Sequence, residues 1–269
     1  MELTPGIRLG PYGRHTKGPA ILVLVAASLL VLHSQDRPRY APPVASAAVL
    51  KGIDFASGAL AGDQFRKRFT TCDSSDTCDG KLLKFGCSKD PNRNTVMLKL
   101  SGNVVFFDGK MGVDADGSPL SQKTPGVTDQ PQTSFRYPSS GNPSVDSDKV
   151  PFIVIPGGGF AKALGVEFGD IAAVVYKDRI AYALVADQGP ACKLGEGSME
   201  LHKELGHTVC IARDAANECT KLRNAGIERD VLYFIFLGSR SKIINGLNPG
   251  NINNRLSVEG AGLMSTINR

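Results

Sequence analysis

The sequence contains no tryptophan, and only 7% of its 269 residues are aromatic. Sugar-binding clefts commonly use aromatic rings as platforms, so this shortage counts against a cleft built from many such rings. Beyond residue 47, the chain has no marked excess of positive or negative charge. Residues 1–47 hold five basic and two acidic residues, and the remainder holds 26 basic and 24 acidic residues. A region with such balanced charges is not expected to carry the basic surface of a nucleic-acid-binding protein. We therefore expect no nucleic-acid partner.

The N-terminal apolar run is too short for a typical membrane-spanning helix. It covers residues 20–32, which is 13 residues, whereas a transmembrane helix needs about 20. Because basic residues precede it, the run is typical of the hydrophobic part of a signal peptide, with Ala45 and Ala47 as candidate cleavage positions. The alternative is a retained membrane anchor at residues 20–33. Both alternatives predict a protein that is secreted or periplasmic, or anchored outside the cytoplasm.

The cysteines support export. All six follow the apolar run, and an even number of cysteines in an exported protein predicts disulfide bonds, although the sequence does not select the pairs. A zinc site is disfavoured because Cys72 and Cys78 are further apart than in the usual C-x₂₋₄-C pattern and no histidine lies nearby. We therefore expect no metal and no cofactor. The cysteines are Cys72, Cys78, Cys87, Cys192, Cys210 and Cys219.

Composition divides the chain into three segments. Residues 1–33 are expected to form the export signal or anchor. Residues 34–79 are expected to be a linker and an irregular, cysteine-containing extension, because residues 34–48 have the proline, alanine and serine content of a disordered linker. Residues 80–269 are expected to form a compact domain.

Short apolar runs bounded by turn residues predict that this domain is mainly β. A helix is expected at residues 198–206, where Leu201 and Leu205 have helical spacing, and a second short helix at residues 213–225. Many short strands with one or two short helices predict a compact β-barrel rather than a βαβ sheet. The strands are expected at residues 95–100, 103–109, 150–156, 170–187 (a hairpin) and 230–238.

Two carboxylates follow the second strand of this hairpin. Asp187 ends an apolar run, and Glu196 stands nine positions later between two glycines. One interpretation is an aspartate that caps a turn. The other is an acid–base pair for glycoside hydrolysis, because inverting hydrolases hold two carboxyl groups about 6.5–9.5 Å apart. Nine extended residues span about 30 Å, so the second interpretation requires the chain to reverse, which the intervening glycines and proline permit.

Two further carboxylates, Asp114 and Asp116, belong to the segment VDADG. The alternation of aspartates is typical of the start of a calcium loop, but position 12 of that loop would be Pro125 rather than glutamate, which excludes an EF-hand. An ordinary turn with Asx hydrogen bonds remains one interpretation. The other is an acidic wall that attracts a polycationic substrate.

Taken in order, four segments resemble the chitosanases of glycoside hydrolase family 75, and the resemblance covers about residues 80–269. It implies endo-hydrolysis of the β-1,4 links of chitosan by an inverting mechanism, with Asp187 of ADQGP and Glu196 of GEGS as the catalytic residues. The D-x-G sequence before a glycine-rich turn also resembles a double-psi β-barrel, which concerns the fold alone. The segments are DGKMGVDADG (108–117), FRYPSSGNPSVDSDKVPFIVIP (135–156), FGDIAAVVYKDRIAYALVADQGPACKLGEGSMELHKELG (168–206) and RDVLYFIFLGS (229–239).

The resemblance and the local sequence together give the remaining expectations. Asp187 is expected to be the general acid, because an apolar strand would raise its pKa, and Glu196 the general base. Asp114 and Asp116 are expected to bind the glucosaminium groups of chitosan. Two other functions fit the same barrel, namely a non-catalytic binder of cell-wall polysaccharide and a peptidoglycan-cleaving enzyme.

Overall fold

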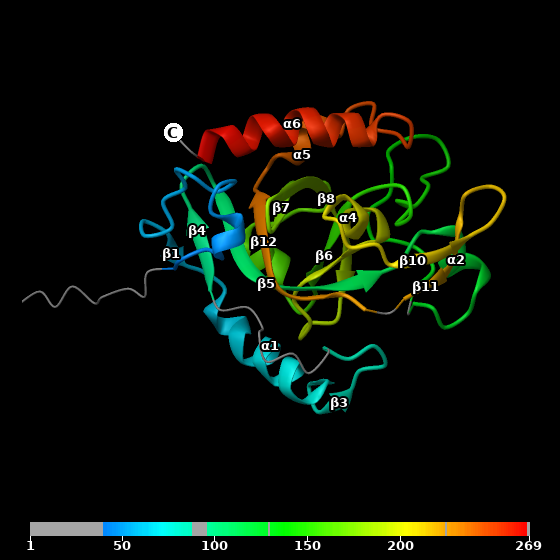
Figure 1. The fold of residues 1–269 in the computed structure, drawn as a ribbon, viewed down its shortest axis with the longest axis horizontal. Coiled ribbons are helices and arrows are strands. Elements are labelled where there is room, and N and C mark those ends of the chain that lie inside the picture. Colours follow the sequence, from blue (N-terminus) through cyan, green and yellow to red (C-terminus); the bar gives the residue numbers. More distant parts are fainter. Residues whose placement is uncertain (1–39, 88–95, 129, 224, 268–269) are drawn as a thin grey trace, which may run out of the picture. The chain divides into compact units, whose positions relative to one another are not determined.

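The computed structural model describes residues 40–87, 96–128, 130–223 and 225–267. The predicted export segment and its candidate anchor lie outside these residues. Within them, no helix has both the length and the apolar character that a membrane span requires. The described chain is mainly β, with a barrel at its centre and short helices around it (Figure 1).

The barrel has six strands and closes on itself. Its strand order is β5–β12–β7–β8–β6–β9, and β9 pairs back onto β5. The β6–β8 and β5–β9 pairs are parallel, and the other barrel pairs are antiparallel. The predicted β-barrel is therefore confirmed. The strands are β5 (Val104–Asp114), β6 (Phe152–Pro156), β7 (Ile171–Tyr176), β8 (Arg179–Gly189), β9 (Glu196–Ser198) and β12 (Ile227–Phe236).

Two further strands extend the sheet beyond β5. The strand β4 (Met97–Leu100) pairs with β5 as the hairpin that the sequence predicts, and β1 (Ala59–Leu60) pairs with β4. The remaining short pair is β2 (Thr77–Cys78) with β3 (Lys81–Leu82).

The barrel strands are buried on both faces, which explains their continuous apolar sequences. Alternate residues of β5 enter two different apolar clusters, Phe106 in one and Phe107 in the other. Helix α6 (Ile252–Ile267) completes the first cluster and packs on β7 and β8 (Figure 1). Helices α1 (Asp63–Ser75) and α3 (Phe160–Leu164) complete the second cluster.

Three other helices are short. They are α2 (Pro119–Lys123), α4 (Met199–Glu204) and α5 (Arg240–Ile243). Helix α4 confirms the predicted helix, and Ser198 caps it by accepting a hydrogen bond from the Leu201 amide at 3.1 Å. Helix α6 has no counterpart among the predicted elements. It approaches β8 closely because it has a glycine, Gly260, where a Cβ atom would collide with the ring of Tyr182.

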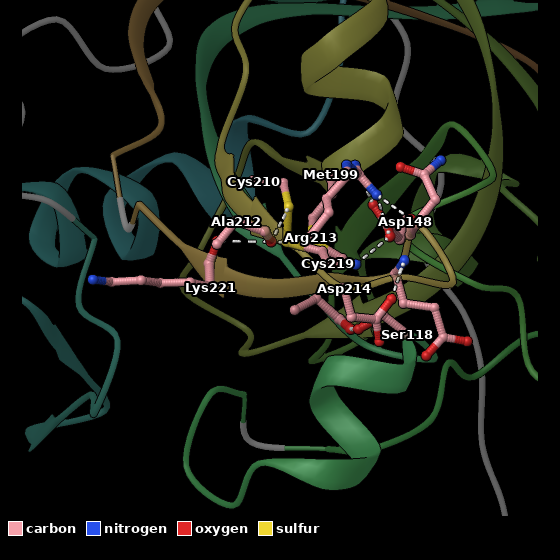
Figure 2. The surroundings of a disulfide bond; sticks show 12 residues. Ser118, Asp148, Met199, Cys210, Ala212, Arg213, Asp214, Cys219 and Lys221 are labelled. Carbon is pink, nitrogen blue, oxygen red and sulfur yellow. Dashed lines mark hydrogen bonds and ion pairs between the residues drawn. A yellow bond between two sulfur atoms is a disulfide. The ribbon is translucent and has the colours of Figure 1, made fainter.

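The helix predicted at residues 213–225 is wrong. This region contributes to a hairpin of β10 (Cys210–Arg213) and β11 (Cys219–Leu222), closed by the Cys210–Cys219 disulfide. Asp214 accepts hydrogen bonds from the amides of residues 216 and 218, so it forms a turn instead of a helix. Figure 2 shows Arg213 paired with Asp148, which also accepts a hydrogen bond from the Cys219 amide.

The expectation of a disordered linker is wrong for its described part. Tyr40 packs against Phe55 and Phe106 with ring centroids 5.1 Å from each, and a 3₁₀ turn, η1 (Val44–Ser46), follows. The extension is also more regular than expected, because it contains the 13-residue helix α1. The division between residues 34–79 and 80–269 stays a prediction.

The predicted disulfides are confirmed, and all six cysteines are paired. The pairs are Cys72–Cys87, Cys78–Cys192 and Cys210–Cys219.

Candidate active site

Strand β6 brings Asp187 and Glu196 into register with each other. Its residue Val154 pairs with Asp187 of β8 on one side and with Glu196 of β9 on the other. Directly opposed residues of neighbouring strands present their side chains on the same face, so both carboxylates flank Val154 on one face of the barrel. Two strand spacings of about 4.8 Å separate their Cα atoms by about 10 Å. Two Cα atoms at this separation can carry carboxyl groups about 6.5–9.5 Å apart, as in an inverting pair.

A β-bulge in β8 is needed for this register. Ile153 pairs with Val185, but the next residue of β6 pairs with Asp187, so Ala186 is the extra residue. A bulge shifts the side chains that follow it to the opposite face, and bulges are frequent beside active sites for this reason. Here the bulge places the Asp187 side chain on the face of Val154 and Glu196.

Asp114 and Asp116 come to the same place from the end of β5. Because β5 pairs in parallel with β9, Asp114 lies opposite Ser198, two residues beyond Glu196. Carboxylate oxygens of Asp114, Asp116 and Asp187 lie within 4.8 Å of one another. All four acidic residues line one cavity of about 730 Å³. The structure therefore groups every candidate residue that the sequence singles out.

Asp187 is held by donors that the sequence gives no reason to select. Its side chain is 1% exposed, and Oδ1 accepts hydrogen bonds from the Ser134 amide at 2.9 Å, the Ser134 hydroxyl at 2.6 Å and the Gln188 amide at 2.7 Å. Three donors compensate for the burial of a carboxylate. Ser134 comes from a long polar loop without a motif, so only the fold connects it with Asp187.

Glu196 has a cationic partner. Lys193 Nζ lies 2.6 Å from Glu196 Oε1, and both side chains are 10% exposed. The ammonium group stabilises negative charge on Glu196 in this confined position. Gly189 makes room for the carboxylate, because a Cβ atom there would lie 2.8 Å from Glu196 Oε2. The lysine stands between the two predicted catalytic residues, but nothing in its sequence context separates it from a surface lysine.

The two acids at the end of β5 have raised pKa values. Burial raises the pKa of Asp114 well above its ordinary value, and the neighbouring charges of Asp116 and Asp187 add to this effect. Burial and the charge of Asp187 raise the pKa of Asp116 to about 8, although a hydrogen bond from Thr128 opposes the shift. Asp116 also shares a side-chain hydrogen bond with Asp187. At neutral pH the cluster of Asp114, Asp116 and Asp187 therefore retains at least one proton.

The same three carboxylates have the spacing of a cation site. A proton on Asp116 reduces the repulsion among these carboxylates, which a bound cation would also reduce. The expectation that no metal or cofactor takes part stays a prediction.

A family model described as fungal chitosanase of glycosyl hydrolase group 75 matches residues 111–257, somewhat more than half of the chain. The matched region contains all four acidic residues of the cavity together with Lys193 and Ser134. No curated protein matches the chain.

Proposed function

Since the chain belongs to the family of fungal chitosanases of glycosyl hydrolase group 75, we propose that it hydrolyses internal β-1,4 links of chitosan with inversion at the anomeric carbon. The observation that carries the proposal is the register of Asp187 and Glu196 on either side of Val154. That register places two carboxyl groups on one face, in one cavity, with a strand between them. A water molecule and a sugar ring fit such an arrangement.

In this mechanism Asp187 is the general acid. It donates a proton to the glycosidic oxygen as the bond from that oxygen to the anomeric carbon breaks. Asp116 supports this role, because the two residues share a hydrogen bond and the pKa of Asp116 is raised to about 8. The pair thus carries a proton at neutral pH that is available to the leaving group. The proton shared with Asp116 is therefore the reason for assigning Asp187 as the acid. The sequence alone suggests a different reason, namely the apolar strand around Asp187.

Glu196 is the general base. It accepts a proton from water as the water oxygen bonds to the anomeric carbon from the opposite side, so each turnover consumes one water molecule. Lys193 supports this role because its ammonium group, 2.6 Å from Oε1, favours a charged carboxylate. Proton exchange with solvent then returns both residues to their starting states.

The proposed substrate is a polycation, and the cavity is acidic. Asp114 and Asp116 are 8% and 5% exposed and line the cavity, where we propose that they bind glucosaminium groups. An ammonium group beside Asp114 would favour the ionised form of that residue, so binding would release a proton there, whereas Asp116 keeps the proton that it shares with Asp187. Because the attraction is electrostatic, it weakens as the salt concentration rises.

The three disulfides fit an extracellular protein. We propose that the protein is secreted or periplasmic, or anchored there through residues 20–33.

The test is the release of reducing ends by the wild-type protein from chitosan, chitin and peptidoglycan side by side. We expect release from chitosan, with the α-anomer formed first in proton NMR spectra. Release from peptidoglycan alone would favour a peptidoglycan-cleaving enzyme. Binding to chitosan without any release would favour a non-catalytic wall-binding protein.

The Asp116→Asn variant tests the shared proton. In the wild type, kcat/KM should fall as the pH rises through about 8, where Asp116 loses its proton. The amide cannot hold that proton, so we expect the alkaline limb of the pH profile to move to lower pH by about one unit or more. An alkaline limb that stays in place would contradict the role of Asp116.

Thermal unfolding is the control for this variant. The folded-state pKa of Asp116 lies above its ordinary value of 3.8, so its ionisation opposes folding as the pH rises from that value to about 8. The neutral amide removes this cost. The Asp116→Asn variant should therefore be at least as stable as the wild type at pH 7.

A further inference from the structure

One wall of the catalytic cavity comes from outside the region that matches the family. Residues 83–86 line the cavity together with Asp187 and Glu196, whereas the family match begins at residue 111. The wall lies between α1 and β4 in the chain, directly after the short β2–β3 pair. The family match therefore does not describe this part of the cavity.

Two disulfides fasten the segment that carries this wall. The Cys78–Cys192 disulfide, on the N-terminal side of the wall, joins the segment to the loop that separates Asp187 from Glu196, and the Cys72–Cys87 disulfide, directly after the wall, joins it to α1. Lys110 of β5 is buried and donates hydrogen bonds to Asp73 of α1 and to the carbonyl of Cys87. A segment held in this way keeps a fixed position relative to the two carboxylates.

Phe85 is the one aromatic residue among the described residues that line this cavity. It is half-buried, and Lys84 Nζ lies 4.7 Å from the centroid of its ring. This distance is within the range of a cation–π interaction, so the face of the ring is accessible to an ammonium group. Lys84 itself is exposed and also lines the cavity.

From this arrangement we propose that Phe85 is a binding subsite for a glucosaminium unit of the substrate. The ring face receives the ammonium group, or the ammonium-bearing edge of the sugar, in place of Lys84 Nζ. Lys84 then acts as a competitor that lowers the affinity for a polycation. The proposal rests on the proposed function, and it adds a substrate contact on the wall that precedes the family match.

The absence of tryptophan gives this proposal a direct readout. In a Phe85→Trp variant the new indole is the sole tryptophan, and its fluorescence should change saturably when a glucosamine hexamer is mixed in and read before hydrolysis. An N-acetylglucosamine hexamer, which carries no ammonium groups, should change it much less. The matched control is Leu82→Trp, because Leu82 belongs to the same segment but is 77% exposed and does not line the cavity.

Steady-state kinetics on chitosan give the second readout. We expect Phe85→Ala and Phe85→Leu to raise KM about tenfold with kcat within about twofold of the wild type, as for loss of one cation–π contact. Phe85→Trp should retain the wild-type KM. Lys84→Gln should lower KM by about twofold to fivefold, since it removes a competing cation and a like charge.

The outcomes separate this proposal from the proposed function. If the wild type does not hydrolyse chitosan, the proposed function fails, and the fluorescence titration still tests the subsite. If chitosan is hydrolysed but the Phe85 variants keep the wild-type KM and the indole at position 85 does not respond to the glucosamine hexamer, the subsite alone is overturned. A Phe85→Leu variant with the wild-type KM would show apolar packing instead of recognition of an ammonium group, which also overturns it.

Discussion

Replacing Asp187 by asparagine or Glu196 by glutamine is expected to lower kcat on chitosan by about a thousandfold or more in each case, with a smaller change in KM. General acid and general base catalysis each contribute about 10²–10⁴-fold to a rate. The amides keep the shape of the acids and remove the proton transfer. Reducing-end release at saturating chitosan measures the effect.

Matched control variants are available at exposed acidic residues of the same barrel. Asp178→Asn changes an exposed aspartate in the turn before β8, and Glu228→Gln changes an exposed glutamate of β12. Both controls should keep the wild-type kcat. If Asp187→Asn and Glu196→Gln each kept more than a tenth of the wild-type kcat, the assignment of the catalytic pair would be contradicted.

The leaving group distinguishes the two roles. A glucosamine oligomer with a dinitrophenyl aglycone needs little protonation of its leaving oxygen, so it should restore much of the rate of Asp187→Asn. It should leave Glu196→Gln slow, because attack by water still lacks a base. The reverse pattern would exchange the acid and the base.

The sequence predicts the barrel strands well because they are apolar on both faces. The runs in β6, β7, β8 and β12 stand out for this reason, and the hairpin of β7 and β8 needs only a local turn. Barrel closure is different, since it depends on the pairing of β9 with both β5 and β6. With only three residues, β9 is too short for its sequence pattern to predict a strand.

The same limit applies to the site. The types and order of residues identify Asp187 and Glu196, and both are found in one cavity. The pairing of Asp187 with Val154, their common neighbour, depends on a bulge in β8 that no local sequence signal marks. Partners distant in sequence, such as Ser134 with Asp187, follow from the fold alone.

The Cys78–Cys192 disulfide should stabilise both the fold and the cavity. It closes a sequence separation of 114 residues, and the chain-entropy model gives about 5 kcal/mol for a loop of that length. Cys78→Ser combined with Cys192→Ser should therefore lower the midpoint of thermal unfolding by about 10–15 °C. The matched control is Cys210→Ser with Cys219→Ser, which opens a separation of nine residues and should cost about 3 kcal/mol.

The two double variants should differ more in catalysis than in stability. Cys192 lies next to Lys193 and four residues before Glu196, so loss of its disulfide frees the loop that positions the base. It also releases the start of the wall that carries Phe85. We expect a higher KM and a lower kcat on chitosan at temperatures where the variant remains folded. If this variant lost stability but kept both wild-type values, the contacts of Lys110 and α1 would hold the wall and the loop without the disulfide.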